Sequence, residues 1–137
     1  MINIINRKKS DPYKRFYFEH ELAKDANQAS IEAIVISSYD TEKKSVESRF
    51  VNLKFIDGEK FIFFSNYSSP KSNQFAQHSQ ISSLIYWNST NTQIRLKAII
   101  KKTNIEFNKS YFKNRSVEKN ALAISSNQSN RIETFQK

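Results

Sequence analysis

The first chemistry that the sequence suggests is phosphate binding, by Arg49, Lys54, Ser65 and Lys71. Guanidinium and ammonium groups pair with phosphate charge, and a hydroxyl adds a hydrogen bond. Lys71 follows a Ser-Pro pair that is typical of a helix start, where free backbone N–H groups attract anions. The spacing predicts a site for one phosphorylated ligand. The alternative interpretation is that these cations of a basic protein face water.

Two strands joined by a tight turn are expected to position these residues. β-branched and aromatic residues on both sides of an Asp57-Gly58 pair, a strong hairpin signal, predict strands over residues 49–55 and 61–64. Because side chains alternate along a strand, Arg49 and Lys54 fall on opposite faces. Only a bulge, or a ligand wrapped around the strand near a subunit boundary, would bring both to one ligand.

The rest of the chain predicts further strands with helices around them. Strands are expected over residues 33–38, 81–87 and 92–102, and helices over 11–27 with Asp11 as N-cap, over 70–77, from Thr103 onward, and over 117–124. Residues 1–10 are interpreted as a flexible arm. Trp87 ends an apolar strand and is expected in the core, whereas His20 lies between two glutamates and is expected in solvent.

Length and composition bound the class of protein. With 137 residues, of which 38% are hydrophobic, the chain can bury one core, so a single domain over residues 11–137 is expected. No apolar run approaches the ~20 residues that span a bilayer and no signal sequence is visible, which predicts a soluble, cytoplasmic protein without a membrane partner. The absence of cysteine excludes disulfides and a thiol nucleophile, and two histidines make a metal site improbable.

The net charge of +9 allows two classes of partner. Nucleic acid is one, because neutralising its phosphates releases counterions and drives binding. A small phosphorylated ligand is the other, since it benefits from the same positive field. The basic residues are scattered rather than gathered in one arm, and composition does not separate these alternatives.

Several short motifs, in their order and separation, resemble the pyridoxamine 5'-phosphate oxidase family. The matching segments are Asp11-Pro12, residues 49–54 (RFVNLK), 63–66 (FFSN), 69–71 (SPK) with Gln74, 93–95 (QIR), 110–112 (SYF) with Arg115, and 128–129 (QS) with 131–132 (RI). Each motif is weak alone, but together they cover nearly the whole chain. The resemblance implies an FMN-binding split β-barrel of about six antiparallel strands with peripheral helices, working as a homodimer with FMN between the subunits. Nucleic acid then becomes the remote alternative.

The resemblance also implies site residues. Those for FMN are Arg49, Phe50, Val51, Asn52, Leu53, Lys54, Phe64, Ser65, Lys71, Gln93, Gln128 and Ser129. Those for the phosphate of a pyridoxal-type substrate are Lys54, Tyr111, Arg115 and Lys119. Because the flavin accepts the hydride and later passes electrons to oxygen, no residue is predicted as an essential catalytic acid or base, and no metal ligand is predicted.

Some positions depart from the family pattern. Pro70 stands where the family often has arginine, and Lys119 stands where it commonly has a substrate-contacting serine. The family's C-terminal segment, with a tryptophan against the flavin and an Arg-x-His-x-Arg-like stretch, has no counterpart before Lys137, and residues 1–10 do not match its substrate-covering segment. The expected function is oxidation of pyridoxamine or pyridoxine 5'-phosphate to pyridoxal 5'-phosphate, a form of vitamin B6. The alternatives are an FMN-binding protein with another redox substrate or with no catalytic activity, and a basic nucleic-acid-binding barrel.

Overall fold

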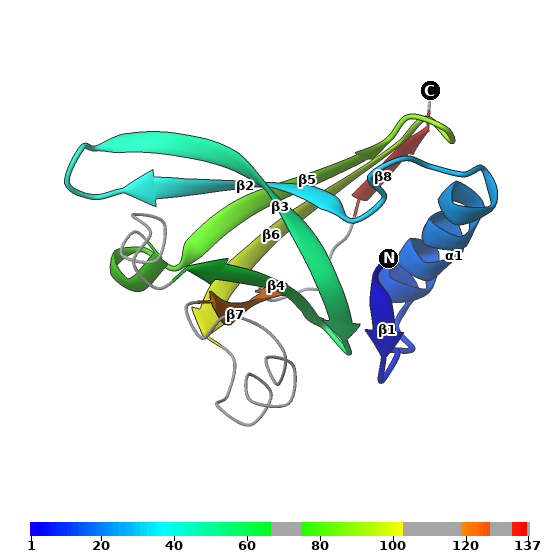
Figure 1. The fold of residues 1–137 in the computed structure, drawn as a ribbon, viewed down its shortest axis with the longest axis horizontal. Helices are drawn as coiled ribbons and strands as arrows, with labels where there is room; N and C mark the ends of the chain where they lie inside the picture. Colours follow the sequence, from blue (N-terminus) through cyan, green and yellow to red (C-terminus); the bar gives the residue numbers. More distant parts are fainter. Residues whose placement is uncertain (67–74, 103–118, 127–132, 137) are drawn as a thin grey trace.

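The computed structural model describes residues 1–66, 75–102, 119–126 and 133–136. One long helix and eight strands make up these residues (Figure 1). They are β1 (Asn3–Ile5), α1 (Asp11–Asp25), β2 (Ala33–Asp40), β3 (Ser45–Asp57), β4 (Lys60–Asn66), β5 (Gln80–Trp87), β6 (Thr92–Lys102), β7 (Lys119–Ser126) and β8 (Glu133–Gln136). A short helical turn at residues 75–77 precedes β5.

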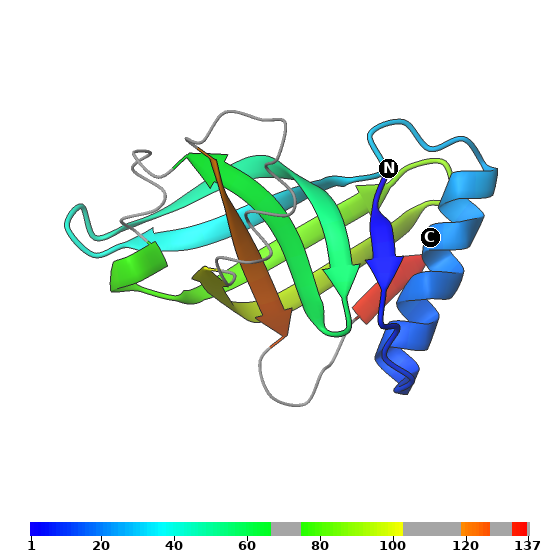
Figure 2. The ribbon, with the colours of Figure 1, turned by 60° about the horizontal axis from the view of Figure 1, so that its bottom comes forward.

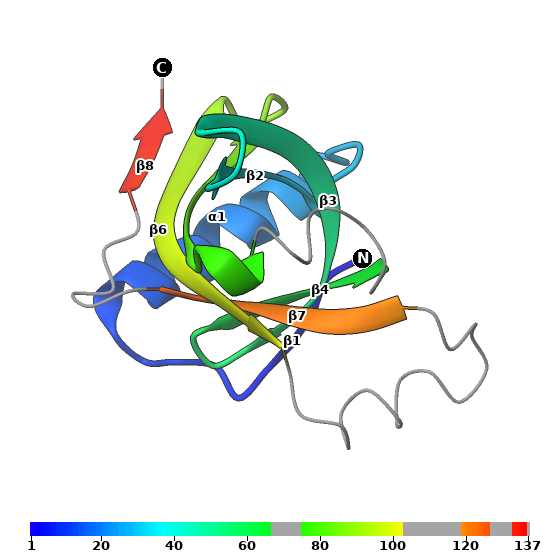
Figure 3. The same cartoon turned by 90° about the vertical axis from the view of Figure 1, so that its left-hand side faces the viewer.

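Six of the strands close into a ring. Their order is β3-β2-β5-β6-β7-β4, and the ring closes because β4 also pairs with β3 (Figure 3). Every pairing in the ring is antiparallel. The prediction of a split β-barrel of about six antiparallel strands is therefore confirmed. Two further strands extend it, since β1 pairs parallel with β3 and β8 pairs antiparallel with β6.

Alternating side chains explain why these segments are strands. Every second residue points into the barrel, and the inward set on β2, β5 and β6 includes Ile34, Ile36, Ile81, Ile85, Trp87, Ile94, Leu96 and Ile100. This period of two buries one face of each strand in a single apolar cluster. The predicted bounds of these three strands agree with the structure to within two residues.

Helix α1 packs across one end of the barrel, and the β2–β3 turn lies at the other end (Figures 1 and 2). Phe16 is fully buried, with its ring centroid 5.3 Å from that of Phe61 and 5.8 Å from that of Trp87. Trp87 is thus a core residue, as predicted. The N-cap is Ser10 rather than Asp11, because the Ser10 carbonyl accepts the first helical hydrogen bonds and Asp11 already belongs to the first turn.

Two predicted elements differ in the structure. The helix expected over residues 117–124 is wrong, since β7 occupies residues 119–126 and pairs with β4 on one side and β6 on the other. The flexible arm expected over residues 1–10 is wrong for residues 3–5, which form β1. Strand β2 pairs with β3 only as far as Asn52, and β1 pairs with β3 farther along, at residues 55–57. In both cases pairing with distant strands outweighs the local sequence signal.

The surroundings of His20 also contradict its expected exposure. Its side chain is 3% exposed and lies beside the rings of Phe16 and Trp87. Helix periodicity places position 20 on the same side as position 16, and that side faces the barrel. Among the described residues no helix has the length and apolar character needed to cross a membrane.

Candidate functional site

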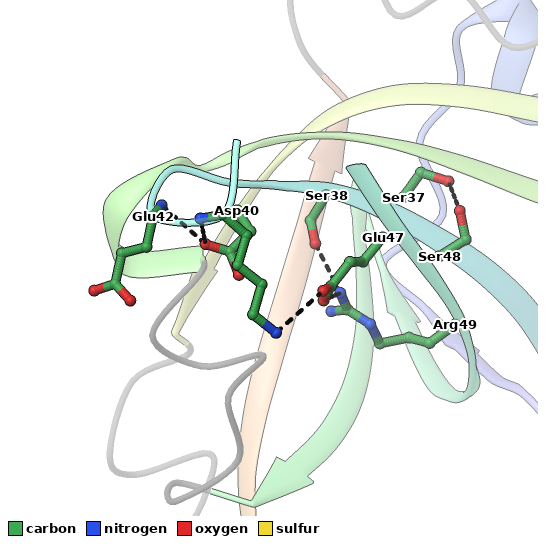
Figure 4. A network of polar contacts seen from close by, with 8 residues as sticks. Ser37, Ser38, Asp40, Glu42, Glu47, Ser48 and Arg49 are labelled. Carbon is green, nitrogen blue, oxygen red and sulfur yellow. Dashed lines mark hydrogen bonds and ion pairs between the residues drawn. The ribbon is translucent and has the colours of Figure 1, made fainter. Parts of the chain in front are cut away.

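Arg49 projects from β3 into the barrel near the β2–β3 turn, and its side chain is only 17% exposed. Its Nη2 donates a hydrogen bond of 2.9 Å to Oγ of Ser38 on the neighbouring strand (Figure 4). Its Cζ lies 5.4 Å from the ring centroid of Phe75. A half-buried guanidinium that rests on a hydroxyl and a ring is a cation suited to bind an anion.

Glu47 shapes the charge around Arg49, and a second carboxylate, Asp40, supports the nearby turn. Glu47 lies 4.0 Å from Nη2 of Arg49 and 3.9 Å from Nζ of Lys43, so it stands between two cations at the limit of ion pairing. Burial lowers the pKa of Arg49 and Glu47 raises it, and the guanidinium remains charged throughout the physiological range. Asp40 is committed to the turn, where its Oδ1 accepts the backbone N–H groups of Glu42 and Lys43 at 2.9 and 3.1 Å.

The end of β2 and the β2–β3 turn contact the short helical turn and the residue that follows it. Thr41 donates a hydrogen bond to the Gln77 side chain, and the rings of Tyr39 and His78 meet edge to face at 5.6 Å. These contacts hold residues 75–78 against the β2–β3 turn. They explain how Phe75, distant in sequence, comes to lie beside Arg49.

A β-bulge interrupts β3 at Lys54. Leu53 pairs with Phe63 and Phe55 pairs with Ile62, so β3 has one residue more than β4 between these pairs. As a result the inward positions change from odd numbers, ending at Leu53, to even numbers at Ile56. A bulge here was one of the two ways, beside a ligand wrapped around the strand, in which Arg49 and Lys54 could serve one ligand, and strict alternation does not continue through residue 54.

Other predicted residues lie on the outer face of the same sheet. Phe50 is 74% exposed and Asn52 is exposed, whereas Val51 and Leu53 are buried in the core beside Arg49. Gln93 is half-buried at the start of β6, on the outer face, and pairs with Tyr86 of β5. Phe64 packs against Ile62 in a small outer cluster. The structure therefore divides the predicted FMN residues between the two faces of the sheet.

Ser65 and Lys119 are more than 50 residues apart in the sequence yet lie on paired strands. Ser65 pairs with Asn120, and Lys119 pairs with Asn66. A residue predicted for FMN thus neighbours one predicted for the substrate. The other predicted residues lie outside the described part of the chain, namely Lys71, Tyr111, Arg115, Gln128 and Ser129.

Sequence reasoning did not identify three neighbours of Arg49, which are Ser38, Glu47 and Phe75. One signal was available for Ser38. It follows Ile34 and Ile36 at a spacing of two, and a serine at the next inward position of an apolar strand indicates a buried polar contact. Nothing in the sequence pattern placed Phe75 near β3.

Two comparisons find similar proteins. Pyridoxine/pyridoxamine 5'-phosphate oxidase from Colwellia psychrerythraea is 35% identical over 111 residues, covering 79% of this chain and 51% of that protein. The oxidase of the same name from Rhodopirellula baltica is 30% identical over 131 residues, covering 94% of this chain and 58% of that protein. The chain therefore spans about half the length of these relatives. No family model matches it.

Solved structures share the architecture at low identity. PhzG from Burkholderia lata, in complex with tetrahydrophenazine-1-carboxylic acid, superposes with a TM-score of 0.79 at 14% identity, over 93% of this chain and 92% of that one. A pyridoxamine 5'-phosphate oxidase-related, FMN-binding protein from Nostoc punctiforme gives a TM-score of 0.71 at 10% identity, over 93% and 97% of the two chains. These likenesses establish the fold.

Proposed function

This chain is a homologue of the pyridoxine/pyridoxamine 5'-phosphate oxidases, and from that premise we propose that it binds FMN and oxidises pyridoxamine or pyridoxine 5'-phosphate, with oxygen as the electron acceptor. The observation that carries the proposal is Arg49, a half-buried cation inside a barrel of the FMN-binding type. The alternative is an FMN-binding protein of this fold with another redox substrate, or with none.

The residues around Arg49 fit a flavin phosphate. A phosphate needs a positive group and hydrogen-bond donors, and an arginine that is largely out of water binds it more strongly than an exposed one. In this proposal Arg49, Ser65, Lys71, Gln128 and Ser129 hold FMN, with Gln93 near its ring system. When bound, FMN supplies the two-electron acceptor.

The substrate half of the site follows from the same homology. We assign Lys54, Tyr111, Arg115 and Lys119 to the substrate phosphate. These groups bind and orient the substrate, and the barrel wall excludes water from one side of it. No side chain is assigned as a general base, because the proton that the substrate loses on oxidation can pass to solvent.

A homodimer explains why the predicted FMN residues lie on two faces. The sheet separates Arg49, on the inside, from Phe50 and Gln93, on the outside, so within one protomer they do not surround one ligand. A second copy placed against the outer face would bring its own residues to a ligand held by the first. Exposed apolar side chains on the outer face support this, since Phe50 is 74% exposed and Tyr86 is 54% exposed. Val35 pairs with Phe50 on one side and with Leu84 on the other, so these three apolar residues form a row across β3, β2 and β5.

The test is to load the purified protein with FMN and add pyridoxamine 5'-phosphate without oxygen. Bleaching of the visible flavin absorbance, reversed by air, is the result expected of an oxidase. An Arg49→Ala variant should bind FMN about tenfold or more weakly, because it loses a charge-assisted hydrogen bond. Bound flavin that stays oxidised would favour the alternative function, and wild-type protein that does not bind FMN would overturn both.

A further inference from the structure

Arg49 does not adopt its position alone, because two buried residues from other elements touch its guanidinium. Ser38 on β2 is 2% exposed and Phe75 is 5% exposed. Neither belongs to the motifs through which the chain resembles its relatives. We propose that Ser38 and Phe75 are positioning residues, which hold the Arg49 guanidinium in the orientation that receives the phosphate of FMN. The inference rests on the proposed function and deepens it.

The hydrogen bond to Ser38 fixes one edge of the guanidinium. In the strand register Arg49 pairs with Ile36, and Ser38 pairs with Glu47, so Ser38 is the diagonal neighbour nearer the turn. The bond of 2.9 Å therefore holds the arginine side chain extended toward the turn. A guanidinium has five N–H donors in a rigid fork, and fixing one of them sets the direction of the others.

The ring of Phe75 limits the remaining freedom. With Cζ at 5.4 Å from the ring centroid, the guanidinium lies within the range of a cation–π contact. An arginine side chain loses rotamer entropy when it is ordered. Ser38 and Phe75 order the Arg49 side chain during folding, so the entropy cost of ordering it when a phosphate binds is smaller.

This role predicts an effect on FMN that riboflavin does not share, because riboflavin lacks the phosphate. In Ser38→Ala we expect the Kd for FMN to rise about fivefold to tenfold, the net effect of one typical hydrogen bond, while the Kd for riboflavin stays unchanged. Ser38→Thr keeps a hydroxyl and should restore most of the affinity. Phe75→Leu keeps the apolar volume but removes the ring face, and should raise the Kd for FMN by a smaller factor of about three.

The chain offers a matched control in Ser83. It is buried to 2% exposure on β5, also points into the barrel, and has no hydrogen-bond partner among the residues that the structure describes. Ser83→Ala thus makes the same change at the same burial, on a strand that pairs with β2. Flavin fluorescence titrations of all four variants would measure both affinities.

The outcomes decide between positioning and general support of the fold. A Ser38→Ala variant that loses FMN and riboflavin affinity equally, or that matches Ser83→Ala, would overturn the inference. The NMR signal of the Arg49 Nε–H group in flavin-free protein gives a second measure. It should report a rigid side chain in the wild type and a mobile one in Ser38→Ala. If the wild type does not bind FMN, the proposed function fails, and this signal still decides whether Ser38 orders Arg49.

Discussion

The two ends of the barrel each contain an arginine–carboxylate pair, but they bury opposite partners. Under α1, Glu19 is fully buried and accepts a bond of 2.8 Å from Arg15, whose side chain is 53% exposed. Near the β2–β3 turn the arginine is the more buried partner, and its carboxylate lies 4.0 Å away. A buried anion with a tight cation is already satisfied. An arginine that is largely out of water, with its carboxylate at 4.0 Å, is a cation suited to bind a negatively charged ligand.

Under the proposed function, the α1 end contributes stability and the Arg49 end contributes binding. Glu19 has a second partner in Thr92, whose hydroxyl donates to it at 3.3 Å, so the pair ties the helix to the start of β6. Substitutions at the α1 end should therefore change the free energy of unfolding, whereas substitutions around Arg49 should mainly change affinity for FMN.

The largest effect is expected from Phe16→Ala. Removing a fully buried ring that touches Phe61 and Trp87 leaves a cavity, and the free energy of unfolding should fall by about 4 kcal/mol. Phe18→Ala on the same helix is the control, because Phe18 is 56% exposed and should cost less than about 1 kcal/mol. Urea denaturation measures both. Phe16→Leu should keep the wild-type ratio of FMN to riboflavin affinity. A changed ratio would contradict the view that the α1 end affects stability and not binding of the FMN phosphate.

A smaller loss is expected from Arg15→Ala, which leaves the Glu19 carboxylate buried without its arginine. The cost should be about 2 kcal/mol, since Arg15 is itself half exposed and water can replace part of the interaction. Lys14→Ala, on the exposed side of the same turn, is the matched control and should be close to neutral. Equal denaturation midpoints for the two variants would show that the pair under α1 contributes nothing.

The pH dependence of stability should come partly from His20. Burial lowers the pKa of His20 from 6.5; Glu21 raises it, and Lys24, Arg7 and the N-terminus lower it. The unfolded chain therefore binds this proton more readily, so the stabilisation is fully present above about pH 6.5 and declines as the pH falls below it. One proton limits the slope to about 1.4 kcal/mol per pH unit. His20→Phe should lose less stability than the wild type between about pH 7 and pH 5.5 in urea denaturation, and identical losses would contradict the prediction.

The smallest effect is expected from Glu47→Gln at the other end. Glu47 is 38% exposed and competes with an incoming phosphate for Arg49, so its neutralisation should tighten FMN binding by about twofold to fivefold. Riboflavin affinity should not change. Glu42→Gln is a control, because the Glu42 side chain is exposed in the turn. Weaker FMN binding in Glu47→Gln would mean that Glu47 orients Arg49 rather than competing for it.

The sequence predicted much of the barrel and less of the site. Alternating apolar residues predicted β2, β5 and β6 to within two residues of their ends, and the conflict in parity between Arg49 and Lys54 raised a bulge as one of two alternatives. The pattern of β7 did not identify a strand, because its two partners lie far away in the sequence. Burial of His20 and the contact of Phe75 with Arg49 likewise depend on which distant elements meet, and no local periodicity encodes that.

The ring closure through β7 has a consequence for synthesis of the chain. Before residues 119–126 leave the ribosome, β2 to β6 can form only an open sheet in the order β4-β3-β2-β5-β6. That sheet has two unpaired edges, β4 and β6, and exposed edges of this kind pair readily with other chains. Because β7 pairs with all of β4 and with residues 98–102 of β6, a single segment of eight residues closes the ring, and β8 then pairs with residues 92–95 of β6. Slow translation just before β7 would therefore prolong the interval in which the nascent protein is most prone to aggregate.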